Sequence, residues 1–248
     1  MPRIDLNCDL GEGAGHDAEL MPLITSANIA CGLHAGDGDT MRATVALALK
    51  HRVALGAHPS LNDREHFGRR ELPVTPSEVH LLVLAQTRVL QVIARQHGAN
   101  LAHVKPHGAL YHLAARDAAL AQAVASAVYE ADPRLILFGP PGSQLIAAGQ
   151  AGGLRVAHEV FADRSYQPDG SLTPRTQPDA LIENSNAAVA QVRQMVRDGV
   201  VTAVDGSQVP IVADTVCLHG DGSQAVFFAT RLNAELRKSR IELKAPGA

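Results

Sequence analysis

The chain has 248 residues, of which 46% are hydrophobic, and its formal net charge is -3. This length suits one α/β barrel better than two ordinary domains, so we predict a single domain over residues 1–248. Arg and Lys are dispersed rather than clustered, which argues against a nucleic-acid partner. No apolar segment is long enough for a membrane span or a signal peptide, and we therefore expect a cytoplasmic protein with no membrane partner.

Short β-type segments alternate with helical segments along the chain. Such alternation is typical of parallel strands covered by helices, and a core of Ala, Val, Leu and Ile with few aromatic residues favours the same α/β architecture. The seven predicted strands are Ile4–Cys8, Ser26–Cys31, Val53–Ala57, Leu101–Lys105, Leu135–Phe138, Arg155–Phe161 and Ile211–Leu218.

One helix has a clear start and stop in the sequence. Thr75-Pro76-Ser77-Glu78 is a capping box with Pro at the first helical position, and Gly98 supplies the stop. Three further segments between strands have a similar composition, and we expect the four helices to form an outer layer. These three segments are Met41–His51, Asp117–Ala131 and Asn184–Asp198.

Two polar segments rich in turn-forming residues, Pro59–Pro73 and Arg164–Pro178, interrupt the alternation. Each follows a strand end directly, where binding loops and lids usually lie. Asp205-Gly206 between two β-prone arms predicts a small hairpin within residues 200–211. The three cysteines have no C-x-x-C spacing, and we expect free thiols.

The strand ends are unusually polar on one face. Side chains two residues apart on a strand point the same way, and the inner face of a barrel is normally filled by Val, Ile and Leu. A polar inner face is costly unless its groups bind one another, water, a metal or a substrate, so we predict an active site at the C-terminal ends of the strands. The residues are Asp5, Asn7 and Asp9; Asn28 and His34; His103, Lys105 and His107; Glu159 and Asp163; and His219 and Asp221.

Two kinds of ligand can be considered for this ring. Imidazole and carboxylate groups suit a divalent cation, and Asp9, His34 and His58 are the candidate metal ligands. The chain has no H-E-x-x-H motif that would mark a metal site. The alternative is structural, in which a strand-end Asp caps a helix and His58 forms a hydrogen bond with a loop carbonyl. The chain also lacks a G-x-x-x-x-G-K-[ST] phosphate loop. Arg69-Arg70 either binds an anion through forked hydrogen bonds, with Arg70 as the candidate anion-binding residue, or is a pair of solvent-exposed arginines.

The strand ends, read together, resemble the successive signatures of the LamB/YcsF family, which comprises the A subunits of 5-oxoprolinase. The motifs are DLNCDLGEG, ANIACGLHAGD, GAHPS followed by FGRR, KPHGALY, EVFADRSY and CLHGD, between Asp5 and Asp221. The resemblance implies a distorted (β/α)7 barrel related to the deacetylases of the glycoside hydrolase/deacetylase superfamily. It also implies ATP-dependent hydrolysis of 5-oxo-L-proline to L-glutamate, with subunits B and C as partners.

Opening an unreactive lactam with ATP needs a base for water, cations over the developing negative charge and a proton donor for the nitrogen. We assign Lys105 and Arg70 to anion stabilisation, Asp9 or Glu159 to the base, and His107 or His219 to the proton donor. The remaining candidates for substrate or anion binding are Asn7, Asn28, Asp163 and Asp221.

Two other functions are compatible with the same ring. The chain would act alone as a metal-dependent amidohydrolase or carbohydrate deacetylase, or it would be a non-enzymatic subunit that binds the substrate and presents it to partners. Mg²⁺ is the expected ion with ATP. The sequence leaves open whether ATP binds this chain or a partner subunit.

Overall fold

The computed structural model describes residues 2–218 and 225–247. Its centre is a closed barrel in which seven strands pair in parallel, each with the next along the chain, and the last pairs back with the first. This confirms the predicted fold class. The strands are β1 (Arg3–Leu10), β2 (Ser26–Ala30), β3 (Ala54–His58), β4 (His103–Val104), β5 (Ile136–Gly139), β6 (Arg155–Phe161) and β9 (Thr215–Leu218).

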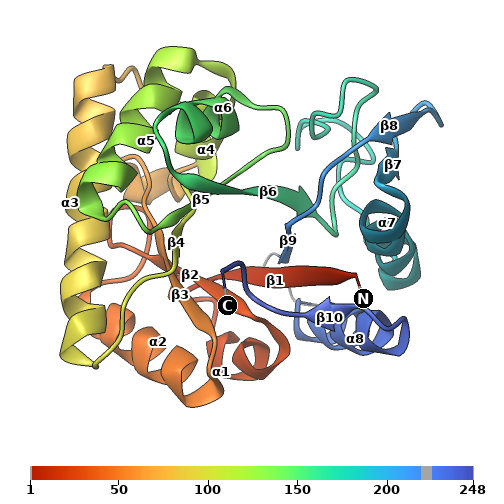
Figure 1. Ribbon diagram of the computed structural model, residues 1–248, viewed down its shortest axis with the longest axis horizontal. Helices are drawn as coiled ribbons and strands as arrows, with labels where there is room; N and C mark the ends of the chain where they lie inside the picture. The colour runs from red at the N-terminus through yellow and green to blue at the C-terminus, as the bar shows by residue number, and fades with distance from the viewer. Residues whose placement is uncertain (1, 219–224, 248) are drawn as a thin grey trace.

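The outer layer contains the four predicted helices, α2 (Gly38–His51), α3 (Pro76–Gln96), α5 (Ala118–Ala131) and α7 (Ser185–Asp198). The capping box of α3 is formed, with Glu78 N donating to Thr75 Oγ1 and Thr75 N donating to Glu78 Oε2. In Figure 1, α3 and α5 lie together on one side of the barrel, and α7 and α8 lie on the other. Elements that the sequence did not predict are α1 (Asp17–Leu20), η1 (Met21–Leu23), η2 (Arg64–His66), α4 (Gly108–Arg116), α6 (Gln144–Ala151), α8 (Ala225–Lys238) and β10 (Glu242–Leu243).

A small antiparallel pair, β7 (Val200–Thr202) and β8 (Gln208–Pro210), lies between α7 and the last barrel strand. Figure 1 shows it projecting beside α7, next to the segment that follows β6. β10 adds to the start of β1 and does not take part in the closure. Among the described residues, no helix combines the length and apolar character needed to cross a bilayer.

The two faces of β1 show how the sequence positions the site. Its apolar residues Ile4, Leu6 and Leu10 are at most 1% exposed and belong to the core that packs against the helices. The intervening Asp5 and Asn7 are equally buried, but they face the inside of the barrel, where they bond to residues from other strands. The predicted alternation therefore holds along this strand.

The polar interior is cross-linked from strand to strand. Thr25, Ser26 and Thr215 donate hydroxyl hydrogen bonds to the Asp5 carboxyl group, at 2.5, 2.8 and 2.6 Å. Burial outweighs these bonds and raises the pKa of Asp5 to about 6. Above this layer, the amide of Asn7 donates to Thr215 Oγ1 and to Glu159 Oε1. The interior is thus a bonded polar layer that supports the strand ends.

One glycine makes room for this layer. A Cβ atom on Gly56 of β3 would lie 2.0 Å from His103 Nε2. The His103 ring stacks on Phe138 at a centroid distance of 4.2 Å and bonds Asn28 Oδ1 at 2.7 Å, so it is held from two sides. Gly56 is therefore needed because the imidazole occupies the space that a side chain would take.

Candidate active site

A cavity of about 740 Å³ opens at the C-terminal ends of the strands, a size typical of small-molecule sites. Its wall includes Asp9 near the end of β1, His58 at the end of β3, and Lys105 and His107 just after β4. Residues of the two long loops, such as Arg69 and Leu172, also line it. The strand ends and the loops predicted to bind ligands thus contribute to one cavity.

Lys105 lies between two carboxylates at the base of this site. Its Nζ is 2.9 Å from Asp9 Oδ1 and 3.0 Å from Glu159 Oε1, and it also donates to Cys217 Sγ. Burial alone would lower the pKa of Lys105, but the charges of these partners, Asp9 foremost, raise it well above the usual value. Burial likewise opposes ionisation of Asp9, but His58 and Lys105 hold its pKa well below the usual range. Both groups therefore stay charged.

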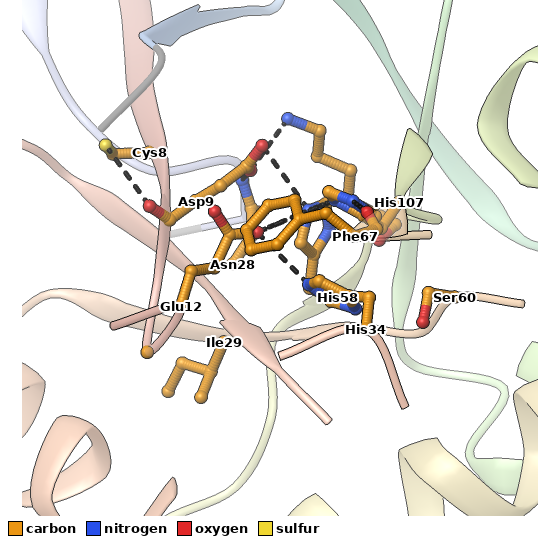
Figure 2. Close-up of polar contacts among 12 residues, drawn as sticks. Cys8, Asp9, Glu12, Asn28, Ile29, His34, His58, Ser60, Phe67 and His107 are labelled. Carbon is orange, nitrogen blue, oxygen red and sulfur yellow. Dashed lines mark hydrogen bonds and ion pairs between the residues drawn. The ribbon is translucent and has the colours of Figure 1, made fainter. Parts of the chain in front are cut away.

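Three histidines converge beside this ion pair, as Figure 2 shows with Glu12 and Asp9 pointing toward the same place. His58 Nδ1 is 2.7 Å from the Lys105 carbonyl, and His107 Nε2 is 2.8 Å from the Phe67 carbonyl. Because a carbonyl only accepts, both nitrogens are donors. In the neutral rings the other nitrogens, His58 Nε2 and His107 Nδ1, then face each other with lone pairs at 2.9 Å.

Lone pairs directed at one point need a proton or a cation between them. Glu12 Oε1 lies 3.1 Å from His34 Nε2, 3.6 Å from His107 Nδ1 and 3.9 Å from His58 Nε2. Ligands about 2.0 to 2.1 Å from a tetrahedral cation are roughly 3.3 Å apart. The three Glu12 distances lie near that value, and the ligand atoms of the four residues all lie within 4.8 Å of one another. Backbone carbonyls that hold the outer nitrogens of ligating histidines are also usual at metal sites. Glu12, His34, His58 and His107 can therefore hold a divalent cation.

The loop after β3 fixes this group from one side. Phe67 adopts a positive φ of 56°, places its ring edge-on to both His34 and His107, and presents its carbonyl to His107. A Cβ on Gly68 would lie 2.9 Å from His34 Cβ and 3.0 Å from His107 Cδ2. The Phe67-Gly68 pair thus lets the loop backbone close on two imidazoles, at the cost of a conformation that non-glycine residues rarely adopt.

A tyrosine completes the wall near Lys105. Tyr111 lies in α4, one turn after His107, and lines the cavity while its side chain is almost fully buried. Burial, followed by the nearby charge of Glu159, raises its pKa well above the usual value. Neither the Tyr111 hydroxyl nor Glu159 Oε2 has a well-formed hydrogen bond within the described residues. The hydroxyl is therefore protonated, and it interacts with the Glu159 carboxylate through a hydrogen bond of poor geometry.

The structure places the predicted residues in three groups. Asp9, His58, Lys105 and His107 line the cavity. Asn7, Asn28 and Glu159 lie in the interior and hold Asp9 and Lys105 by hydrogen bonds and an ion pair. His34 joins the histidine group without contributing to the cavity wall. His219 and Asp221 lie outside the described residues.

Two predicted residues lie elsewhere. The Arg70 side chain is 54% exposed and pairs with Asp63 at 3.3 Å, and it is Arg69, its neighbour, that lines the cavity. Asp163 follows β6 and is not part of the cavity wall. Of the three candidate metal ligands, His34 and His58 lie together with Glu12 and His107 in the group that could hold a cation, whereas Asp9 lies beside it, with Oδ2 3.3 Å from His58 Nε2.

Sequence reasoning missed three residues that line the cavity, Glu12, Tyr111 and Arg164. Each lies in a motif that was recognised, DLGEG, KPHGALY or EVFADRSY, but beyond the core of its strand. Strand parity says nothing about positions in loops and helices. His112, which lies in α4, also lines the cavity.

The fold and the site define a class, a closed parallel α/β barrel with a polar cavity and a candidate cation site at the C-terminal ends of its strands. Among solved structures, the peptidoglycan deacetylase PdaC from Bacillus subtilis shares this fold, with 12% identity, a TM-score of 0.51 and coverage of 98% of this chain and 87% of that one. The chain belongs to the LamB/YcsF family, whose model matches residues 4–248.

Close relatives span the whole chain. A protein of Shouchella clausii, named as the A subunit of 5-oxoprolinase, is 55% identical over 250 residues, which cover 99% of each chain. The crystal structure of the lactam utilization protein from Thermus thermophilus matches with 42% identity and a TM-score of 0.93, covering 98% of this chain and 99% of that one. The resemblance noted in the sequence motifs is confirmed.

Proposed function

We propose that this chain is the A subunit of an ATP-dependent 5-oxoprolinase, which hydrolyses 5-oxo-L-proline to L-glutamate in the cytoplasm together with subunits B and C. The names of the relatives support this substrate. The Shouchella clausii protein, for example, matches this chain over its full length, and more than half of its residues are identical. The observation that carries the proposal is a cavity in which a permanently charged Lys105–Asp9 pair, a neutral Tyr111 hydroxyl and a histidine group share one wall.

Each group has a part in opening a lactam. Lys105 is fixed by three partners and stabilises negative charge on the amide oxygen or on a transferred phosphoryl group. Asp9 and Glu159 hold that ammonium in place, and the low pKa of Asp9 makes it a weak base. The His107 Nε2 proton is committed to Phe67, so we assign proton donation toward the lactam nitrogen to Tyr111.

The histidine group would hold a divalent cation through Glu12, His34, His58 and His107. When bound, such a cation supplies Lewis acidity and lowers the pKa of a bound water. Three imidazoles and one carboxylate suit Zn²⁺, Co²⁺, Ni²⁺ or Mn²⁺ better than Mg²⁺, which prefers oxygen ligands. The Mg²⁺ that accompanies ATP is therefore a separate ion in this proposal.

The histidine group also favours a second candidate, a metal-dependent amidohydrolase that acts without ATP or partners. The two functions make different demands. The first needs ATP and the partner subunits for turnover, whereas the second needs only the loaded cation.

The test is to incubate the purified chain, with and without its B and C subunits, with 5-oxoproline, Mg²⁺ and ATP, and to follow glutamate release. We expect release only with ATP and the complete set of subunits. ATP-independent hydrolysis of amides or N-acetyl sugars by the metal-loaded chain alone would replace this proposal with the second. Binding of 5-oxoproline without turnover in any reconstituted mixture would make the chain a substrate-presenting subunit.

A further inference from the structure

The cavity wall carries polar side chains that the proposed chemistry does not use, among them two arginines. Arg164, from the loop after β6, and His112, from α4, both line it, and so does Arg175. The acidic residues of the same wall are partly engaged elsewhere, since Glu71 pairs with Arg116 at 2.6 Å and Asp169 accepts a hydrogen bond from Ser171 N. Glu71 and Arg116 thus offset each other, while Arg164 and Arg175 contribute positive charge to this part of the cavity.

Arg164 is the unusual member of this set. It is only 3% exposed, and its guanidinium donates from Nε to the Ala180 carbonyl at 3.2 Å and from Nη2 to the Thr173 carbonyl at 2.6 Å. Among the ion pairs of the described residues, none includes Arg164. Carbonyl groups orient a guanidinium but do not neutralise it, and Asp163, the largest of the nearby influences that favour the charge, forms no ion pair with Arg164 among those of the described residues.

The neighbouring charges point the same way. Burial, followed by the positive charge of Arg175, lowers the pKa of Arg164. Burial, followed by the charges of Arg164 and Arg175, lowers the pKa of His112 as well. An oxyanion placed in the cavity beside Arg164 would relieve this repulsion. A guanidinium has five N–H donors in a planar fork, and the two bonds to carbonyls leave donors for a carboxylate.

We propose that Arg164 is the carboxylate subsite of this cavity, with His112 beside it, and that it binds the carboxylate of the cyclic amide substrate. This proposal rests on the proposed function, because 5-oxoproline carries one carboxylate in addition to its lactam. Arg164 would then fix one end of the substrate while Lys105 and Tyr111 act on the other. The two carbonyl bonds to the loop backbone hold the guanidinium ready for that role.

The experiment compares two ligands and three variants. Binding of 5-oxoproline and of 2-pyrrolidinone, the same lactam without the carboxylate, is measured by calorimetry on the chain alone and with its partner subunits. Arg164→Gln removes the charge, Arg164→Lys keeps it without the fork, and Arg134→Gln is the control, since Arg134 is an exposed partner of Asp132. Thermal unfolding of each variant confirms that it folds, and acetate and inorganic phosphate serve as simple anion probes.

We expect Arg164→Gln to weaken 5-oxoproline binding about 10- to 100-fold, Arg164→Lys to weaken it less, and both to leave 2-pyrrolidinone binding unchanged. Equal weakening of the two lactams, no change in either, or weakening of phosphate binding alone would each overturn the subsite. If the unaltered protein binds no 5-oxoproline but acetate stabilises it only when Arg164 is present, the subsite stands and the proposed function fails.

Discussion

Two imidazole nitrogens, His58 Nε2 and His107 Nδ1, face each other at 2.9 Å because the opposite nitrogen of each ring is committed to a backbone carbonyl. Without a proton or a cation between them, two lone pairs would repel each other in a buried place. A bound cation also satisfies Glu12, which is close to all three rings. The tautomers dictated by the backbone thus direct either a shared proton, with Asp9 Oδ2 3.3 Å from His58 Nε2, or a bound cation to this place.

Replacing a central member of this group should remove the cation. We expect His107→Gln to lower the affinity for Zn²⁺ or Co²⁺ by more than the roughly 10- to 100-fold that loss of a supporting group costs. Metal content after dialysis against a limiting chelator, measured by elemental analysis, checks this. His80→Gln, which alters a partly buried residue of α3 that pairs with Glu130 of α5, is the control and should retain its metal. Equal metal content in the two variants would show that the histidine group is not a cation site.

The Tyr111 hydroxyl should matter for turnover and little for folding. We expect Tyr111→Phe to lower kcat of the reconstituted complex by about 10²- to 10⁴-fold with a small change in KM, because only a proton donor is lost. Tyr166→Phe is a matched control. Its hydroxyl is also buried but accepts from Phe161 N at 2.8 Å, so we expect lower stability and an unchanged kcat. A Tyr111→Phe enzyme with normal kcat would remove Tyr111 from the chemistry.

At the scale of elements, the period of an extended strand predicted most of what the structure shows. Asp5, Asn7 and Asp9 were placed correctly on the inner face because β1 stays extended through Leu10. β2 ends at Ala30, and Gly32 and Gly36 then take positive φ, so the place of His34 follows from turns and not from parity. Residues beyond strand ends are positioned by contacts between distant loops, which a local sequence pattern does not encode.

The short helices α4 and α6 were not predicted, for a related reason. α4 and α6 are only nine and eight residues long, and they follow strand ends at Pro106-His107 and Pro140-Pro141 that also resemble loops. Such short helices are stabilised mainly by packing against the barrel and only weakly by intrinsic propensity. The 21-residue α3, with its capping box and terminal glycine, carries its own start and stop signals and was predicted within one or two residues.

The fit between β3 and β4 gives a stability prediction. Gly56→Ala should lower the free energy of unfolding by about 1 to 3 kcal/mol, because its Cβ would overlap a His103 ring that Phe138 and Asn28 hold in place. Urea unfolding measures the change. Gly38→Ala is the control, since its Cβ would meet only the flexible Arg42 side chain at 3.3 Å.

The origin of the Gly56 effect can be separated by a double variant. Removing the ring with His103→Ala makes room for the new methyl group, so the two costs should not add, and a coupling of at least about 0.5 kcal/mol is expected. Strict additivity would mean that the His103 ring is not what excludes a side chain at position 56.

For the whole molecule, the closed barrel buries two titratable groups whose effects on stability have opposite signs. Burial raises the pKa of Asp5 to about 6 and lowers the pKa of His103 to about 3. Between about pH 4 and 6, folding therefore keeps a proton on Asp5 that the unfolded chain releases, and it excludes a proton from His103 that the unfolded chain binds. The two contributions cancel over this range, so together they add little pH dependence.

Single variants should expose the cancellation. Asp5→Asn leaves only the His103 contribution, so the free energy of unfolding should fall more steeply on acidification than in the unaltered protein, by up to about 1.4 kcal/mol per pH unit between about pH 4 and 6. His103→Gln leaves only the Asp5 contribution, and the slope should change by a similar amount in the opposite direction. Urea unfolding at several pH values gives both slopes, and every other titrating group is common to the three proteins. Slopes that shift in the same direction, or not at all, would mean that these groups are not held neutral inside the barrel.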